Sequence, residues 1–215
     1  MRVEVKVCGL TCPEDARAAA ALGARYVGAI FAGGPRHLEP AAARAVLDGG
    51  GDAVERVGVF GDADAAAIAR IVREAKLDIV QLHADPGPEA VRTIREATGA
   101  RVWAVVRVGG AIEAGALGEL WDAADALVLD SKVKGVLGGT GTSFDWSATE
   151  GVARARRGRL VVAGGLTAAN VGEAIESLSP DIVDVSSGVE SAPGIKDHAR
   201  MAEFMEAVRR TGVLR

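Results

Sequence analysis

The sequence has little that would tie it to a membrane, a secretory route or nucleic acid. It contains no apolar run of about 18 residues or more, which a transmembrane helix would need. It shows no basic segment followed by an apolar core, so we expect no signal peptide. The formal net charge is only −4, and no basic block interleaved with aromatics is present. We therefore expect a cytoplasmic protein with neither a nucleic-acid partner nor a membrane partner.

Cysteine is also scarce, since Cys8 and Cys12 are the only two. Two cysteines cannot build a disulfide framework, and in a reducing cytoplasm Cys8 is expected to be a free thiol. Cys-x3-Cys could contribute to a metal site, but zinc needs further ligands. The three histidines, at positions 37, 83 and 198, lie far apart without ligand spacing. We therefore predict that no metal is bound.

Nearly half of the residues are apolar, which is enough for a sizeable core. They form eight short β-like runs whose starts lie about 20 to 35 residues apart, the length of one strand–helix unit. The runs are VEVKVC (3–8), YVGAIF (26–31), RVGVF (56–60), DIVQLH (78–83), RVWAVV (101–106), DALVLD (125–130), RLVVAG (159–164) and DIVDVS (181–186).

The segments between these runs read as amphipathic helices. PEDARAAAALGA, for example, has Pro13 and two acids in a first turn and Gly23 as a stop. Eight strands alternating with helices predict a (β/α)8 barrel of the TIM type, in the α/β class. The main alternative is an open doubly wound sheet, but no G-x-G-x-x-G follows the first run. Because no linker or low-complexity stretch interrupts the pattern, residues 1–215 are expected to form a single domain.

In such a barrel, chemistry takes place at the carboxyl ends of the strands. The three valines of VEVKVC share one face, whereas Glu4, Lys6 and Cys8 share the other. If the valines pack against the helices, Cys8 points inward at the mouth. A buried small hydrophobic residue is the equally plausible alternative for a free cysteine. Gln81 and His83 end the fourth run at the same edge.

Asp130 closes the apolar run LVLD, so it must be solvated, paired or part of a site. A helix N-cap or a loop anchor is the alternative, but the following SKVKG does not resemble a helix start. Glycine clusters follow the last three runs: GGTG (138–141), AGGL (163–166) and SSGVE (186–190). Glycine lets backbone N–H groups approach a phosphate closely, although each cluster could be only a tight turn. These residues predict a barrel enzyme or binding protein that takes a small phosphorylated molecule. A thiol and a carboxylate would lie at the mouth of the barrel.

Motifs along nearly the whole chain resemble the phosphoribosylanthranilate isomerases of tryptophan biosynthesis, an aromatic amino-acid pathway. They are VKVCGLT, GPRHLEP, VGVF, VQLH, LVLDS, GGTGTSFDW, AGGLTAANV and VDVSSGVESAPGIKDH, in family order. The resemblance implies an Amadori rearrangement of N-(5-phosphoribosyl)anthranilate to 1-(2-carboxyphenylamino)-1-deoxyribulose 5-phosphate. It also implies a phosphosugar substrate and no cofactor, and it leaves open whether the protein is a monomer or a homodimer.

The resemblance also implies roles for individual residues. Cys8 would be the general base and Asp130 the general acid, and Arg36 would hold the anthranilate carboxylate. The phosphate would be bound by glycine loops that contain Gly139, Gly141, Gly164, Gly165, Ser187 and Gly188.

Three of the polar assignments have structural alternatives. Arg36 could form a surface ion pair, and His83, expected to line the pocket, could simply be packed or hydrogen-bonded at its strand end. Asp184 could bind sugar hydroxyls or form a salt bridge with Lys6 inside the barrel. The chain departs from the family pattern at Gly33 and Gly34 before Arg36, and at Ala84.

Two other functions are alternatives to this one. The related aminoaldose isomerase of histidine biosynthesis resembles two half-barrels, each with an Asp at the end of its first strand; here that position is Cys8, and no close half-repeat is seen. A non-catalytic phosphosugar-binding protein would be expected to have lost the catalytic pair. Cys8 and Asp130 are both present, so the isomerase is the predicted function.

Overall fold

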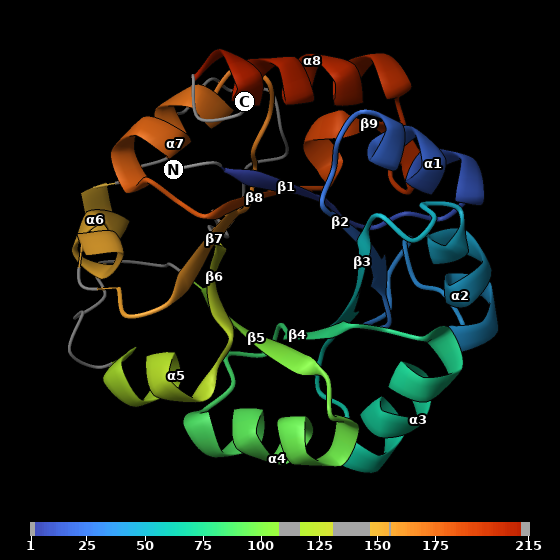
Figure 1. Cartoon of the computed structure of the whole chain (residues 1–215), viewed down its shortest axis with the longest axis vertical. Coiled ribbons are helices and arrows are strands. Elements are labelled where there is room, and N and C mark those ends of the chain that lie inside the picture. Colours follow the sequence, from blue (N-terminus) through green and yellow to red (C-terminus); the bar gives the residue numbers. More distant parts are fainter. Residues whose placement is uncertain (1–2, 108–116, 131–146, 155, 212–215) are drawn as a thin grey trace.

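The computed structural model describes residues 3–107, 117–130, 147–154 and 156–211. Eight parallel strands form a closed barrel in sequence order, and β8 pairs with β1 to complete it (Figure 1). The strands are β1 (Glu4–Val7), β2 (Tyr26–Ile30), β3 (Glu55–Phe60), β4 (Ile79–Leu82), β5 (Arg101–Arg107), β6 (Ala126–Asp130), β7 (Arg159–Ala163) and β8 (Ile182–Val185).

A ring of helices surrounds the barrel (Figure 1). The helices are α1 (Pro13–Ala21), α2 (Pro40–Asp48), α3 (Ala65–Ala75), α4 (Pro88–Thr98), α5 (Gly118–Ala123), α6 (Ser147–Arg154), α7 (Val171–Leu178) and α8 (His198–Arg210). The connection from β8 to α8 holds a short 3-10 helix, η2 (Ser187–Val189), and an antiparallel hairpin of β9 (Glu190–Ala192) and β10 (Ile195–Lys196). No described helix is both long and apolar enough to cross a membrane.

Two layers of apolar side chains hold the fold together, one on each face of the sheet. The larger layer lies between the strands and the helices and contains all three valines of the first strand region. The smaller layer fills the barrel interior, where Tyr26 and Trp103 pack edge to face with ring centroids 5.1 Å apart. Successive side chains of a strand point to opposite faces, so one strand supplies both layers. This alternation turns Lys6 and Cys8 toward the barrel axis.

The predicted barrel is confirmed, and every predicted strand boundary lies within one residue of the observed one. The open doubly wound alternative is wrong because β1 and β8 pair along four residues. Residues that favour helix ends also lie where they are expected. Proline occupies the first turn of α1, α2 and α4, and α1 ends two residues before Gly23. The sequence patterns did not predict α5, α6, η2 or the β9–β10 hairpin.

Candidate active site

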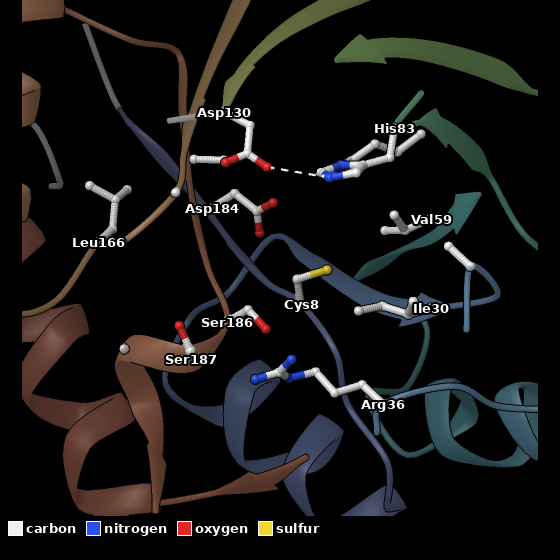
Figure 2. A pocket seen from close by; sticks show the side chains of 16 residues that line it. Cys8, Ile30, Arg36, Val59, His83, Asp130, Leu166, Asp184, Ser186 and Ser187 are labelled. Atoms are coloured by element: carbon white, nitrogen blue, oxygen red, sulfur yellow. Dashed lines mark ion pairs between the residues drawn. The ribbon is translucent and has the colours of Figure 1, made fainter. Parts of the chain in front are cut away.

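A cavity of about 300 Å³ opens at the carboxyl ends of the barrel strands. Figure 2 shows four polar side chains converging on it. Cys8 and His83 directly follow β1 and β4, whereas Asp130 and Asp184 lie on β6 and β8. Nine predicted site residues line this one cavity: Cys8, Arg36, His83, Asp130, Gly164, Gly165, Asp184, Ser187 and Gly188. The other two, Gly139 and Gly141, lie outside the described residues. Within the described part of the chain, no cluster of three or more His, Cys, Asp or Glu residues is suited to a metal.

Lys6 and Asp184 form a buried ion pair directly beneath Cys8. Because β1 and β8 are adjacent, Lys6 and Asp184 are register partners, and Lys6 Nζ lies 2.9 Å from Asp184 Oδ2. The Lys6 side chain is fully buried, and Asp184 is 8% exposed. Of the two roles predicted for Asp184, the salt bridge with Lys6 is confirmed.

The ion pair controls the charge around the Cys8 thiol. Burial disfavours the charged form of Lys6, but the Asp184 carboxylate and the Cys8 sulfur outweigh it and raise the pKa of Lys6, which stays an ammonium ion. Burial also raises the pKa of Cys8, and Asp184 adds to this effect, whereas the Lys6 ammonium opposes it. Lys6 is therefore the group that favours the thiolate most strongly, and the thiolate is the basic form of cysteine.

Gly28 on β2 leaves the space in which the thiol and the ammonium meet. A Cβ at Gly28 would lie 3.2 Å from Cys8 Sγ and 3.3 Å from Lys6 Cε. Contacts of this length would require the neighbouring side chains to shift. β2 therefore carries glycine where the Cys8 thiol and the Lys6 ammonium need room.

If Cys8 is the base, replacing Lys6 with methionine should move the limb of the pH–rate profile that reports Cys8 to higher pH, because a positive charge that lowers the Cys8 pKa is removed. The measurement is kcat/KM as a function of pH for wild type and Lys6→Met. The variant leaves the buried Asp184 without its partner, so its stability also varies with pH. Circular dichroism at each pH would give the folded fraction, and the limb corrected for it reports on the thiol. An unmoved limb would contradict the role of Lys6.

Asp130 and His83 face each other on the other side of the cavity. His83 Nε2 lies 3.6 Å from Asp130 Oδ2, the ion pair drawn in Figure 2. Asp130 is 20% exposed at its side chain, so it is reached by solvent or by a bound ligand. The predicted pocket position of His83 and its strand-end contact are thus both observed.

Three buried polar atoms around the cavity have no hydrogen-bond partner in the described part of the chain. They are Gln81 Oε1, His83 Nδ1 and Asp184 Oδ1. An unsatisfied buried polar group costs about 1–3 kcal/mol, so such atoms are suited to a ligand that donates hydrogen bonds. Gln81 is not among the site residues that the sequence predicts. The signal that could have identified it is an amide in the middle of the apolar strand IVQL, on the inward face.

The late glycine loops form the side of the cavity next to β7 and β8. Gly164 and Gly165 have φ values of 90° and 64°, a left-handed conformation that favours glycine. Gly188 packs so tightly that a Cβ would lie 1.9 Å from the carbonyl oxygen of Leu166. The loops after β7 and β8 are therefore in backbone contact, with Ser187 beside them (Figure 2).

Comparison with other proteins covers almost the whole chain. Residues 5–207 match the family model described as N-(5'phosphoribosyl)anthranilate (PRA) isomerase. The chain is 42% identical over 210 residues to N-(5'-phosphoribosyl)anthranilate isomerase of Acidithiobacillus ferrooxidans, covering 97% of this chain and 98% of the relative. The chain belongs to the phosphoribosylanthranilate isomerase family.

Solved structures of the isomerase family share the fold over almost the whole chain. Phosphoribosyl anthranilate isomerase from Thermotoga maritima superposes with a TM-score of 0.85 at 34% identity, covering 97% of this chain and 99% of its own. A second structure holds reduced 1-(o-carboxyphenylamino)-1-deoxyribulose 5-phosphate; its TM-score is 0.82 at 32% identity, with 97% and 99% of the two chains covered.

Proposed function

We propose that this member of the isomerase family converts N-(5-phosphoribosyl)anthranilate to 1-(2-carboxyphenylamino)-1-deoxyribulose 5-phosphate, a step of tryptophan biosynthesis, with Cys8 as base and Asp130 as acid. The observation that carries the assignment of roles is that the Cys8 thiol and the Asp130 carboxyl line the same cavity from separate strands. A base and an acid on different sides of a bound sugar can act on two of its atoms. The family supports the reaction, and the cavity supports the roles.

The reaction needs one proton delivered and one removed. Asp130 would protonate the ring oxygen, so that the C1′–O bond breaks and an iminium ion forms between C1′ and the aryl nitrogen. The iminium makes the C2′ proton acidic, and the Cys8 thiolate would remove it. The electron pair of the C2′–H bond then forms the enolamine, which tautomerises to the aminoketone. Each general acid or base typically contributes on the order of 10²–10⁴-fold.

The other groups of the cavity would bind the substrate. The buried acceptors of Gln81 and Asp184 are suited to sugar hydroxyls, which donate hydrogen bonds. Arg36 would bind the anthranilate carboxylate, for which a guanidinium is a better partner than an amine. The loops around Gly165 and Gly188 would bind the phosphate through backbone N–H groups.

Glycine at position 188 should be needed for that phosphate loop. Gly188→Ala should raise KM roughly tenfold or more, which is about 1.4 kcal/mol of binding, because the new Cβ forces the two loops apart. Steady-state kinetics would show it. Gly172→Ala is the control, since its Cβ would meet only Thr211 Cγ2, at 3.9 Å. Equal KM values for the two variants would contradict this role of the loop.

The isomerase assay tests the proposed function directly. Phosphoribosylanthranilate would be generated in place, and the loss of its fluorescence would be followed after this protein is added. Rapid loss is expected with wild type. No loss with folded protein would contradict the function and favour a phosphosugar-binding protein.

The assembly state is a separate prediction. A solved structure with a TM-score of 0.82 is of monomers generated from the dimeric phosphoribosylanthranilate isomerase of Thermotoga maritima. For this chain, monomer or homodimer is the prediction, and sedimentation equilibrium would distinguish the two.

A further inference from the structure

Arg36 reaches the cavity with its guanidinium paired to a carboxylate from another part of the chain. It lies in the loop after β2, and Figure 2 shows it extending across the mouth toward Ser186 and Ser187. Its Nε donates to Glu190 Oε1 at 2.8 Å and its Nη2 to Glu190 Oε2 at 2.5 Å. The two residues are 154 positions apart in sequence. This is a bidentate, charge-assisted pair, which fixes the plane of the guanidinium.

Glu190 is itself held rigidly at the start of β9. Lys196 on β10 donates from Nζ to Glu190 Oε1 at 2.8 Å and to the carbonyl oxygen of Ser186 at 3.1 Å. The side chains of Glu190 and Lys196 are 4% and 0% exposed. Arg200 on α8 also donates to the main-chain oxygen of Glu190. The hairpin after β8 therefore presents its carboxylate in a single orientation.

Close packing fixes the stem of Arg36 as well. A Cβ at Gly9 would lie 2.6 Å from Arg36 Cδ, and one at Gly194 would lie 3.8 Å from Arg36 Cγ. Thr11 anchors the hairpin from the other side through a 2.5 Å hydrogen bond to the carbonyl oxygen of Gly194. The loops after β1, β2 and β8 thus meet around one arginine side chain.

This arrangement decides which edge of the guanidinium a ligand can use. A guanidinium offers one pair of N–H groups at Nε and Nη2 and another pair at its Nη1 and Nη2 end. Glu190 occupies the first pair. Among the described residues, Nη1 has no hydrogen-bond partner in the structure. Arg36 can therefore receive an external carboxylate only end-on.

The charges of the cluster agree with a ligand group that carries one negative charge. Burial raises the pKa of Glu190, but the hydrogen bonds from Arg36 and Lys196 outweigh it and hold the pKa below its ordinary value. Burial lowers the pKa of Lys196, and the Glu190 carboxylate opposes this effect. With Lys196 protonated, the three side chains carry one net positive charge, which the single aryl carboxylate would neutralise.

We propose that Glu190, held by Lys196, is a positioning residue that orients Arg36 so that its Nη1 and Nη2 end binds the aryl carboxylate of the substrate. This inference rests on the proposed function, in which Arg36 binds that carboxylate. Glu190 does not touch the substrate. It determines whether the enzyme distinguishes an anthranilate group from an aniline group.

The test compares two ligands that differ only in that carboxylate. One is reduced 1-(o-carboxyphenylamino)-1-deoxyribulose 5-phosphate, and the other is the same compound without the carboxyl group. Calorimetry would measure both dissociation constants for wild type, Glu190→Gln and Glu190→Ala. Wild type should prefer the carboxylated ligand by roughly 10- to 100-fold. Glu190→Ala should lose most of that preference, while its affinity for the ligand without carboxyl changes by less than about threefold.

Glu190→Gln separates positioning from folding. Gln has the same shape and still accepts one hydrogen bond, so we expect a preference between those of wild type and the alanine variant, and KM should rise more than kcat falls. Glu55→Gln is the matched control, because Glu55 pairs with Arg25 and Arg101 at the amino-terminal end of β3, away from the cavity. It should keep the wild-type preference.

Two results would overturn the inference. One is an undiminished carboxylate preference in both Glu190 variants, and the other is an equal loss of affinity for both ligands, which indicates a merely structural role. Failure of the proposed function looks different. Wild type would then show no isomerase turnover, a result that does not depend on any Glu190 variant.

Discussion

Replacing Cys8 with alanine is expected to lower kcat by roughly 10²–10⁴-fold, while the dissociation constant of the reduced product changes little. The thiolate is the only group assigned to remove the C2′ proton, and alanine leaves nothing in its place that can accept one. The side chain is small and only 6% exposed, so its loss removes little binding surface. Turnover therefore suffers far more than affinity, as expected for an interaction made in the transition state.

Cys12→Ala is the matched control for this experiment. Cys12 precedes α1, makes no side-chain cap hydrogen bond and does not belong to the residues that line the cavity. Its variant should keep wild-type turnover. Cys8→Ser adds a second test, because a hydroxyl fits the space but ionises far less readily than a thiol. Turnover of Cys8→Ala within about tenfold of wild type would exclude the thiolate as the base.

The same assignment predicts the shape of the pH dependence. Cys8 must be deprotonated to act, and burial raises its pKa above the ordinary value. Asp130 must be protonated to deliver its proton, so the wild-type kcat/KM should pass through an optimum and fall on both sides of it. The limb that reports the Cys8 pKa should be absent from the residual rate of Cys8→Ala.

Asp130→Asn is expected to reduce kcat by a similar factor of about 10²–10⁴, again with little loss of ligand affinity. Asparagine preserves the shape and the hydrogen-bonding capacity of the side chain, but its amide cannot deliver a proton to the ring oxygen. Ring opening would then depend on water. Single-turnover fluorescence decay with excess enzyme measures this step directly.

The control for this variant is Asp122→Asn on α5. Asp122 is 64% exposed and pairs only loosely with Arg157 at 3.4 Å, so its amide should leave turnover unchanged. A second comparison is the double variant Cys8→Ala with Asp130→Asn. If the two residues act on one substrate in one sequence of steps, the combined loss should be smaller than the product of the single losses. A single-turnover rate of Asp130→Asn close to that of wild type would exclude Asp130 as the acid.

The sequence by itself determined the barrel and the face of the first strand on which each side chain lies. Eight apolar runs of five or six residues, separated by helical segments, leave few folds other than a closed parallel barrel. Side-chain alternation within VEVKVC also predicted that Cys8 points into the barrel. The elements that it did not predict are short or irregular: α5 has six residues, and η2 has three. Such segments carry too few turns for a periodic pattern.

Only the tertiary structure decided which charges meet. Lys6 and Asp184 are 178 positions apart and pair because the last strand closes against the first. Arg36 meets Glu190 because the hairpin after β8 folds over the loop after β2. Asp130 faces His83 across the mouth because β6 and β4 lie on nearby parts of the same ring. Periodicity reports the face on which a residue lies, which is a local property. Pairing depends on barrel closure, which brings together side chains that no local pattern relates.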